Sequence, residues 1–222
     1  MTSEVRPGVS AIGAPVDRFW DRTLRVAWWS VALGIGLEVV QLVLFAFQDR
    51  LPTVAQTVAE TAGKVSWSVL VCVSISCGLA AGKARPRAMG LLGALSAPVG
   101  FAIARSVHKS VGSALSVAPG AAEALSPFLL AGIKAVEYGA LGLVVARLTS
   151  RPVISLRSHL VVGLSIGAVT ALVVSVLLLR LRPDTRLAVL ATQAVAEVLF
   201  PIGCAAVIYV TERAARLARR DS

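Results

Sequence analysis

The sequence predicts an all-α, multi-pass membrane protein with six transmembrane helices. Apolar residues make up 56% of the 222 residues and charged residues only 15%, which is typical of polytopic membrane proteins and not of soluble domains. Several apolar runs have the roughly 20 residues that an α-helix needs to cross a hydrocarbon core. Basic residues exceed acidic ones by ten, and most lie between the apolar runs or at the chain ends, where they would contact anionic lipid headgroups.

Six spans follow one another along the chain. They cover residues 24–47, 65–82, 88–107, 128–148, 159–179 and 187–210. The first is longer than the apolar part of a signal peptide and no small-residue cleavage site follows it, so we expect it to be retained. The third is the least apolar. The chain thus divides into an interfacial N-terminal segment (1–23), a first three-helix unit (24–107), a connecting loop (108–127), a second three-helix unit (128–210) and a basic tail (211–222).

The two three-helix units contain similar short segments in the same order. The third span contains APVGFAIA and the sixth contains FPIGCAAV. A glutamate in the first span of each unit, Glu38 or Glu137, precedes the Pro-X-Gly by 60 and 64 residues respectively. An odd number of spans per unit would make the units face opposite ways, so the pattern predicts two inverted repeats, a plan found in secondary transporters. Helix kinks are expected at Pro98, Gly100, Pro201 and Gly203.

The distribution of Lys and Arg predicts that both termini are cytoplasmic. The termini and the loops 82–88 and 147–158, together with Arg25 at the adjoining end of the first span, hold 14 of the 22 basic residues. The loops on the other side, together with Arg105 at the adjoining end of the third span, hold seven. We therefore expect a multi-pass protein of the cell membrane. The excess of Arg over Lys, with abundant Ala, Gly and Val, is typical of GC-rich bacterial genomes and favours a bacterial inner membrane. Trp28, Trp29 and Trp67, near the starts of the first two spans, are expected to be interfacial anchors.

Polar residues are predicted to form a layer near the middle of the membrane. The first, fourth and sixth spans each carry one glutamate, roughly 13 to 15 Å from the outer end of the helix at 1.5 Å per residue. This depth is near the centre of a ~30 Å hydrocarbon core. One helical turn closer to the outer end, each of these spans carries a Lys or a Gln. The six residues of this predicted site are Glu38, Gln41, Lys134, Glu137, Gln193 and Glu197.

Such a layer is costly, which favours a functional role. An acidic or basic side chain at the centre of a membrane helix costs about 2.5 to 3.5 kcal/mol on insertion scales. Lys134 and Glu137 lie three residues apart and can neutralise each other, whereas no cation lies within two helical turns of Glu38 or Glu197 on the same predicted span. We expect a small transporter or channel whose carboxylates bind a proton, a metal or an organic cation. Lys134 would hold the empty site near neutrality.

A second hypothesis is a non-catalytic scaffold or assembly subunit of a larger membrane complex. It is favoured by the lack of a sizeable soluble domain and by two segments expected to be helix contacts, GLAAG and GLSIG. An intramembrane enzyme is the least favoured class, because no HExxH motif and no adjacent acidic pair occur. We predict no catalytic residue, no cofactor, no resident metal and no nucleic-acid partner. Homodimerisation is left open.

Overall fold

The computed structural model of the chain describes residues 10–117 and 125–218, apart from the side chains of residues 10–18, 82 and 83. Within these ranges the chain is helical and contains no strand. Its elements are α1 (Ser10–Ala46), α2 (Val54–Cys77), the 3-10 helix η1 (Gly78–Ala84), α3 (Arg85–Ala114), α4 (Pro127–Thr149), α5 (Leu156–Leu181) and α6 (Leu187–Ala218). Parts of the predicted N-terminal segment, connecting loop and basic tail lie outside the described residues.

The all-α prediction is confirmed, and six described helices are long and apolar enough to cross a membrane. Helix α4 begins and ends within one residue of the predicted span. Helix α1 begins at Ser10 and not at residue 24, and α2 begins at Val54 and not at residue 65. The other helices extend beyond their apolar runs at one or both ends, since polar residues can continue a helix into the headgroup region.

The early start of α2 is set by a capping box. The Thr53 hydroxyl accepts a hydrogen bond from the Gln56 backbone N–H at 3.3 Å, and the Gln56 side-chain oxygen accepts one from the Thr53 N–H at 2.8 Å. Because the helix starts there, Trp67 lies well inside it. The prediction of an interfacial anchor is wrong for Trp67, which is 7% exposed and packs edge-on against Phe101 and Tyr138.

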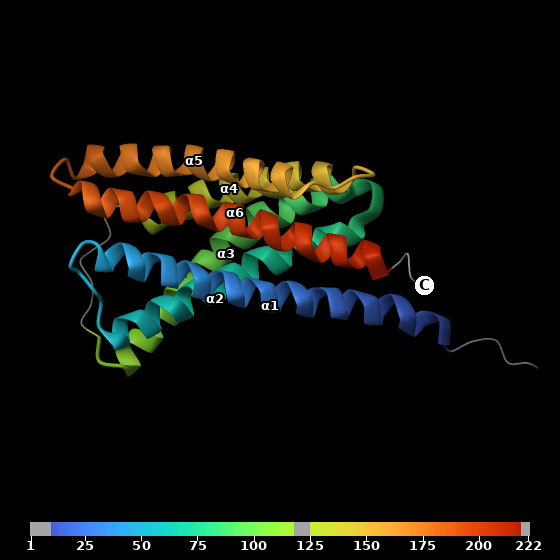
Figure 1. Cartoon of the computed structure of the whole chain (residues 1–222), viewed down its shortest axis with the longest axis horizontal. Coiled ribbons are helices and arrows are strands. Elements are labelled where there is room, and N and C mark those ends of the chain that lie inside the picture. The colour runs from blue at the N-terminus through green and yellow to red at the C-terminus, as the bar shows by residue number, and fades with distance from the viewer. Residues whose placement is uncertain (1–9, 118–124, 219–222) are drawn as a thin grey trace, which may run out of the picture.

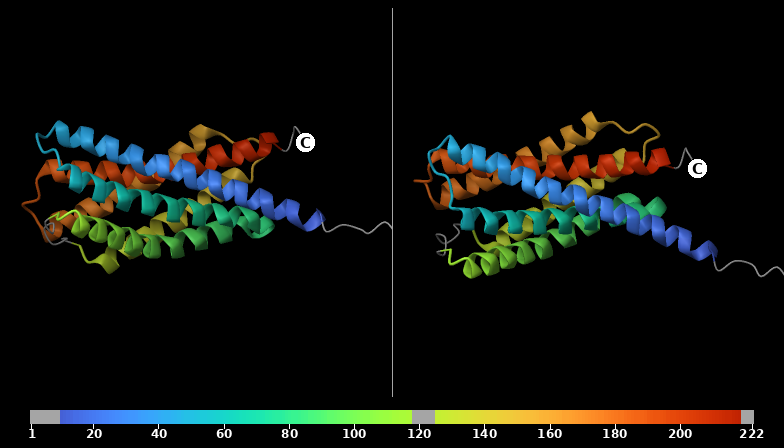
Figure 2. Two further views of the ribbon diagram at one scale, coloured as in Figure 1. Left: turned by 90° about the horizontal axis from the view of Figure 1, so that it is seen from below. Right: turned by 60° about the horizontal axis from the view of Figure 1, so that its bottom comes forward.

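The helices form an elongated bundle with two distinct ends (Figure 1). One end, called the termini end below, holds both described chain ends and the connections 78–84 and 150–155. The opposite end holds the connections 47–53 and 182–186, together with residues 115–117 after α3 and 125–126 before α4. Helix α3 packs against α2 and α4, α5 packs against α6, and α1 contacts both α2 and α6. Figure 2 shows α1 running obliquely across its neighbours.

The apolar core fills the half of the bundle nearest the termini end. At the crossing of α3 and α4, the two backbones touch. A Cβ atom on Gly93 would lie 2.2 Å from the Tyr138 carbonyl oxygen, and one on Gly142 would lie 2.3 Å from the Met89 carbonyl oxygen. Only glycine fits such a contact. Fully buried side chains from four helices surround this crossing: Val71, Ile75, Met89, Leu141, Val145 and Ile208.

Helices α5 and α6 are held together by the predicted GLSIG contact, which is confirmed. A Cβ atom on Gly163 would lie 2.6 Å from the Ile202 Cα, and one on Gly167 would lie 2.8 Å from the Val198 Cα. The segment also matches the Gly-x-Ser-x-Gly pattern of serine hydrolases. Its serine, Ser165, lies within a continuous helix and not on the strand-to-helix turn that exposes such a nucleophile. The two glycines therefore serve close helix packing.

The prolines of the predicted kinks both lie inside helices that continue through them, Pro98 in α3 and Pro201 in α6. Proline has no backbone N–H, so the carbonyl four residues earlier lacks its helical donor. For Pro201 this is the carbonyl of Glu197, which lies against α5. A Cβ atom on Gly167 would be 2.9 Å from that oxygen. Gly100 lies against Trp67 and Gly203 against Leu33.

Candidate functional site

A cavity of about 470 Å³ lies in the half of the bundle opposite the termini end, and residues from all six helices line it. The side chains of Glu60 and His108, 52% and 40% exposed, mark its mouth. Lys134 and Glu197 line it at depth and are buried. Towards the core the lining ends in aromatic side chains: Trp67, Phe101 and Phe200. The cavity thus leads from one end of the bundle to buried charges near its middle.

The buried charges at the base of this cavity form the Lys134 cluster, defined here as Lys134, Glu137, Gln193 and Glu197. The Lys134 Nζ donates to Glu137 Oε2 at 2.8 Å and also to Glu197 Oε2. The Gln193 Nε2 donates to Glu197 Oε1 at 2.8 Å. Helices α4 and α6 are joined through these bonds. Two carboxylates share one ammonium, so the cluster carries one formal negative charge in excess when all three groups are ionised.

Glu38 belongs to a separate ion pair on the other side of the cavity. Its carboxylate accepts a hydrogen bond from the Lys64 Nζ of α2, and both side chains are largely buried, 5% and 13% exposed. Lys64 also lies 3.6 Å from Glu60, one helical turn away on the same helix. The Glu38–Lys64 pair joins α1 to α2 and is neutral. Helix α1 contacts α2 closely here, because a Cβ atom on Gly34 would lie 2.7 Å from the Val65 Cα.

The six residues predicted as a site therefore fall into three groups. Gln41, Lys134, Gln193 and Glu197 line the cavity. Glu38 does not line it but contacts Lys64, which does. Glu137 bonds Lys134 yet faces a different cavity, between α4 and α5.

Sequence reasoning missed Lys64, Arg105 and Glu60 as cavity residues. Lys64 and Glu60 were counted in a loop because the hydropathy of α2 rises only after residue 65. The capping box at Thr53 and Gln56 is the signal that could have placed them on the helix. Arg105 and His108 lie on the last turns of α3, which extends beyond the predicted span. Whether these two side chains line the cavity depends on the rotation of α3 about its axis, which the sequence does not give.

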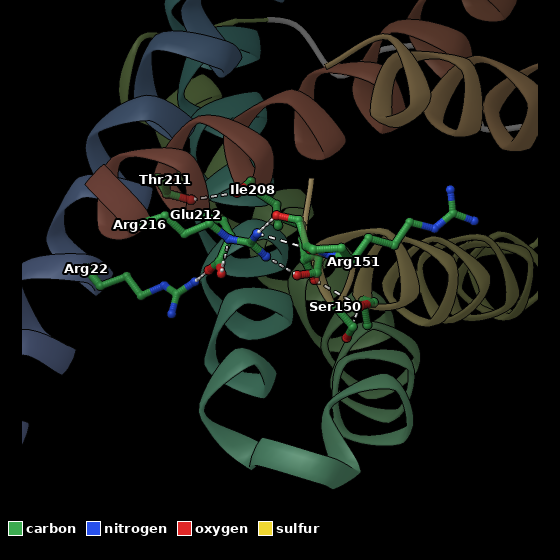
Figure 3. A network of polar contacts seen from close by, with 10 residues as sticks. Arg22, Ser150, Arg151, Ile208, Thr211, Glu212 and Arg216 are labelled. Carbon is green, nitrogen blue, oxygen red and sulfur yellow. Dashed lines mark hydrogen bonds and ion pairs between the residues drawn. The ribbon is translucent and has the colours of Figure 1, made fainter. Parts of the chain in front are cut away.

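A second polar network closes the termini end of the bundle (Figure 3). Glu212 of α6 is 2% exposed and accepts a hydrogen bond from Arg22 of α1. Its other oxygen accepts one from the Arg216 Nε at 3.3 Å. Arg216 in turn donates to the carbonyl oxygens of Arg151 and Pro152, both at 3.1 Å, and to that of Thr149. This network, called the Glu212 network below, joins α1, α6 and the α4–α5 connection.

Six described helices meet the length and hydropathy of membrane spans, which supports a multi-pass α-helical membrane protein. No protein-family model, curated protein or solved structure matches the chain. The cavity, the Lys134 cluster and the Glu212 network are therefore the features that indicate a function.

Proposed function

We propose that the chain is a small membrane transporter that moves a proton or a small cation through the Lys134 cluster. The observation that carries the proposal is the excess charge of this cluster at the base of a one-sided cavity. A buried carboxylate without a compensating charge is costly in a medium of low dielectric constant. Either a proton or a monovalent cation would neutralise the cluster. Exchange of a proton for a cation at the Lys134 cluster would couple the movement of protons to that of the cation.

The different packing of the two halves supports alternating access. One half contains the cavity, and the other contains the apolar core and the Glu212 network. A transporter in which the site is open to one side is closed on the other side by packing and ion pairs. We assign the Glu212 network as the gate of the closed side. The proposed inverted repeat, with Glu38 and Glu137 at equivalent positions, would let the two units exchange these roles.

The orientation proposed from the basic residues places the termini end in the cytoplasm. The position of Lys64 strengthens this orientation, because Lys64 pairs with Glu38 inside the bundle and does not count as a loop charge on the other side. In this orientation the cavity faces the outside of the cell. The membrane proposed is the bacterial inner membrane, whose anionic headgroups would contact the basic ends of α1 and α6.

A flux assay tests this function. The purified chain is reconstituted into liposomes that contain a pH-sensitive dye, and a gradient of Na⁺, K⁺ or a small organic cation is imposed. We expect cation-dependent pH changes with the wild-type chain. Glu197→Gln removes the excess charge of the cluster while it retains a hydrogen-bonding side chain, so flux should fall at least tenfold, the effect of about 1.4 kcal/mol at the site.

The matched control is Asp49→Asn, which changes an exposed carboxylate that lies on the α1–α2 connection and does not line the cavity. Asp49 has a positive φ of 51°, which asparagine tolerates. This variant should transport like the wild type. Unchanged flux in a folded Glu197→Gln variant would refute the role of the cluster. A folded wild-type chain without flux for any of these cations would favour the scaffold hypothesis instead.

A further inference from the structure

A second cavity, of about 670 Å³, lies between the first half of α4 and the middle of α5. Its wall is almost wholly apolar, and several of its residues, such as Val136 and Val169, are exposed on the outer surface of the bundle. In a membrane these exposed residues would contact lipid. The volume is within the range of roughly 300 to 1,000 Å³ that is common for small-molecule sites. This cavity is called the α4–α5 groove below.

Glu137 is the one charged residue among those that line this apolar groove. Glu137 has a fully buried side chain, 0% exposed, and its Oε2 accepts the bond from Lys134. Its Oε1 is buried and has no hydrogen-bond partner among the residues that the structure describes. Of the four carboxylate oxygens in the Lys134 cluster, the other three accept bonds from Lys134 or Gln193. An unpartnered carboxylate oxygen in apolar surroundings favours a cationic hydrogen-bond donor.

We propose that the α4–α5 groove binds an organic ammonium ion with an apolar body. The ammonium N–H would donate to Glu137 Oε1, and the apolar body would occupy the space between the two helices. The charge of the ligand matches the single excess negative charge of the cluster. The apolar wall excludes a hydrated inorganic ion, because such an ion would lose its water ligands without replacement.

The groove and the main cavity contact the same cluster from two sides. Glu137 lines the groove, whereas Lys134 and Glu197 line the main cavity. An ammonium ion bound to Glu137 would compete with Lys134 for that carboxylate. The inference therefore deepens the proposed function, on which it rests: the transported cation is a lipophilic amine that enters sideways from the membrane and leaves through the main cavity.

The test compares two probes of the same shape, 4-phenylbutylammonium and the uncharged 4-phenylbutanol. Binding is measured by calorimetry with the full chain in nanodiscs of zwitterionic lipid, and empty nanodiscs give the background. We expect the wild-type chain to bind the ammonium at least tenfold more tightly than the alcohol, because a hydrogen bond to a charged group is stronger than one between neutral groups. Glu137→Gln should remove this difference and leave the weaker binding of the alcohol unchanged.

Two variants on the exposed surface of α5 keep the test independent of the folding of Glu137→Gln. Val169→Trp would fill the groove and should weaken both probes at least tenfold. Leu172→Trp, at an exposed position outside the groove, should weaken neither. The inference is overturned if Glu137→Gln binds the ammonium like the wild type, or if Val169→Trp has no effect. A wild-type chain that binds neither probe, as expected if lipid chains fill the groove, also overturns it.

A change in oligomeric state in Val169→Trp, without ammonium binding by the wild type, would show that a second copy occupies the groove and would likewise refute the inference.

Failure of this inference can be separated from failure of the proposed function. A chain that moves protons or inorganic cations in liposomes but binds no ammonium retains the function and loses this ligand. A chain that binds the ammonium at Glu137 but moves no cation retains the site and loses the transport function.

Discussion

The Glu38–Lys64 pair gives a quantitative test of how the membrane-embedded charges stabilise the bundle. Both side chains are largely buried, so the pair falls in the class for which removal of one partner costs about 3 to 5 kcal/mol. Glu38→Gln leaves Lys64 with Glu60 at 3.6 Å, so we expect the lower value, about 3 kcal/mol. Lys64→Met leaves Glu38 without a cation among the described residues and should cost about 4 kcal/mol.

The double variant carries neither charge and should be within about 1 kcal/mol of the wild type, because replacement of both members of a buried pair by uncharged side chains leaves neither charge buried without its partner. Unfolding free energies are measured in bicelles by titration with a denaturing detergent and tryptophan fluorescence. Glu60→Gln is the control, since Glu60 is half-exposed and its pair with Lys64 should contribute less than about 1 kcal/mol. Additive costs in the double variant would refute a direct coupling between Glu38 and Lys64.

Three further outcomes follow from the packing and from the two ends of the bundle. Gly142→Leu should prevent stable folding, because its Cβ would lie 2.3 Å from a backbone oxygen. The control is Gly36→Leu, which should unfold at the wild-type temperature because no atom lies within 4 Å of its Cβ. Glu212→Gln should weaken the bonds that join α1, α6 and the α4–α5 connection at the termini end. In a chain that keeps Cys204 as its single cysteine, this variant should speed maleimide labelling at least several-fold. An unchanged labelling rate would contradict the proposed role of the Glu212 network as a gate. Lys134→Met leaves two adjacent carboxylates without their shared cation, so its unfolding temperature should be lower than that of the wild type, and an unchanged unfolding temperature would contradict this reasoning.

The sequence carries most of the fold because the bilayer imposes strong constraints on composition. The apolar run of α4, bounded by Pro127 and by the polar residues after Thr149, locates that helix to within a residue. Hydropathy fails where a helix begins in polar residues, as α2 does at Val54. That error placed Lys64 in a loop and Trp67 at the membrane surface. Local capping chemistry, and not hydropathy, contains the information that corrects both positions.

The sequence predicts a common depth for the three glutamates of the site but does not predict the cation that each one contacts. Residue counts along each helix placed Glu38, Glu137 and Glu197 at one level, since the rise per residue of an α-helix is fixed. Which cation each carboxylate contacts depends on the rotation and neighbours of each helix, which are set by tertiary packing such as the Gly93 contact between α3 and α4. For this reason the partner of Glu38 on α2 and the position of Glu137 beside the α4–α5 groove emerge only from the structure.

The central claim is that one negative charge of the Lys134 cluster is exchangeable between a proton and a cation. The direct measurement is proton release on cation binding, followed with a pH indicator in weakly buffered detergent solution at several starting pH values. The wild-type chain should release up to one proton per chain as the cation saturates it, and Glu197→Gln, with no excess charge, should release none. Saturable binding without proton release at any pH, or equal release from Glu197→Gln, would contradict the claim.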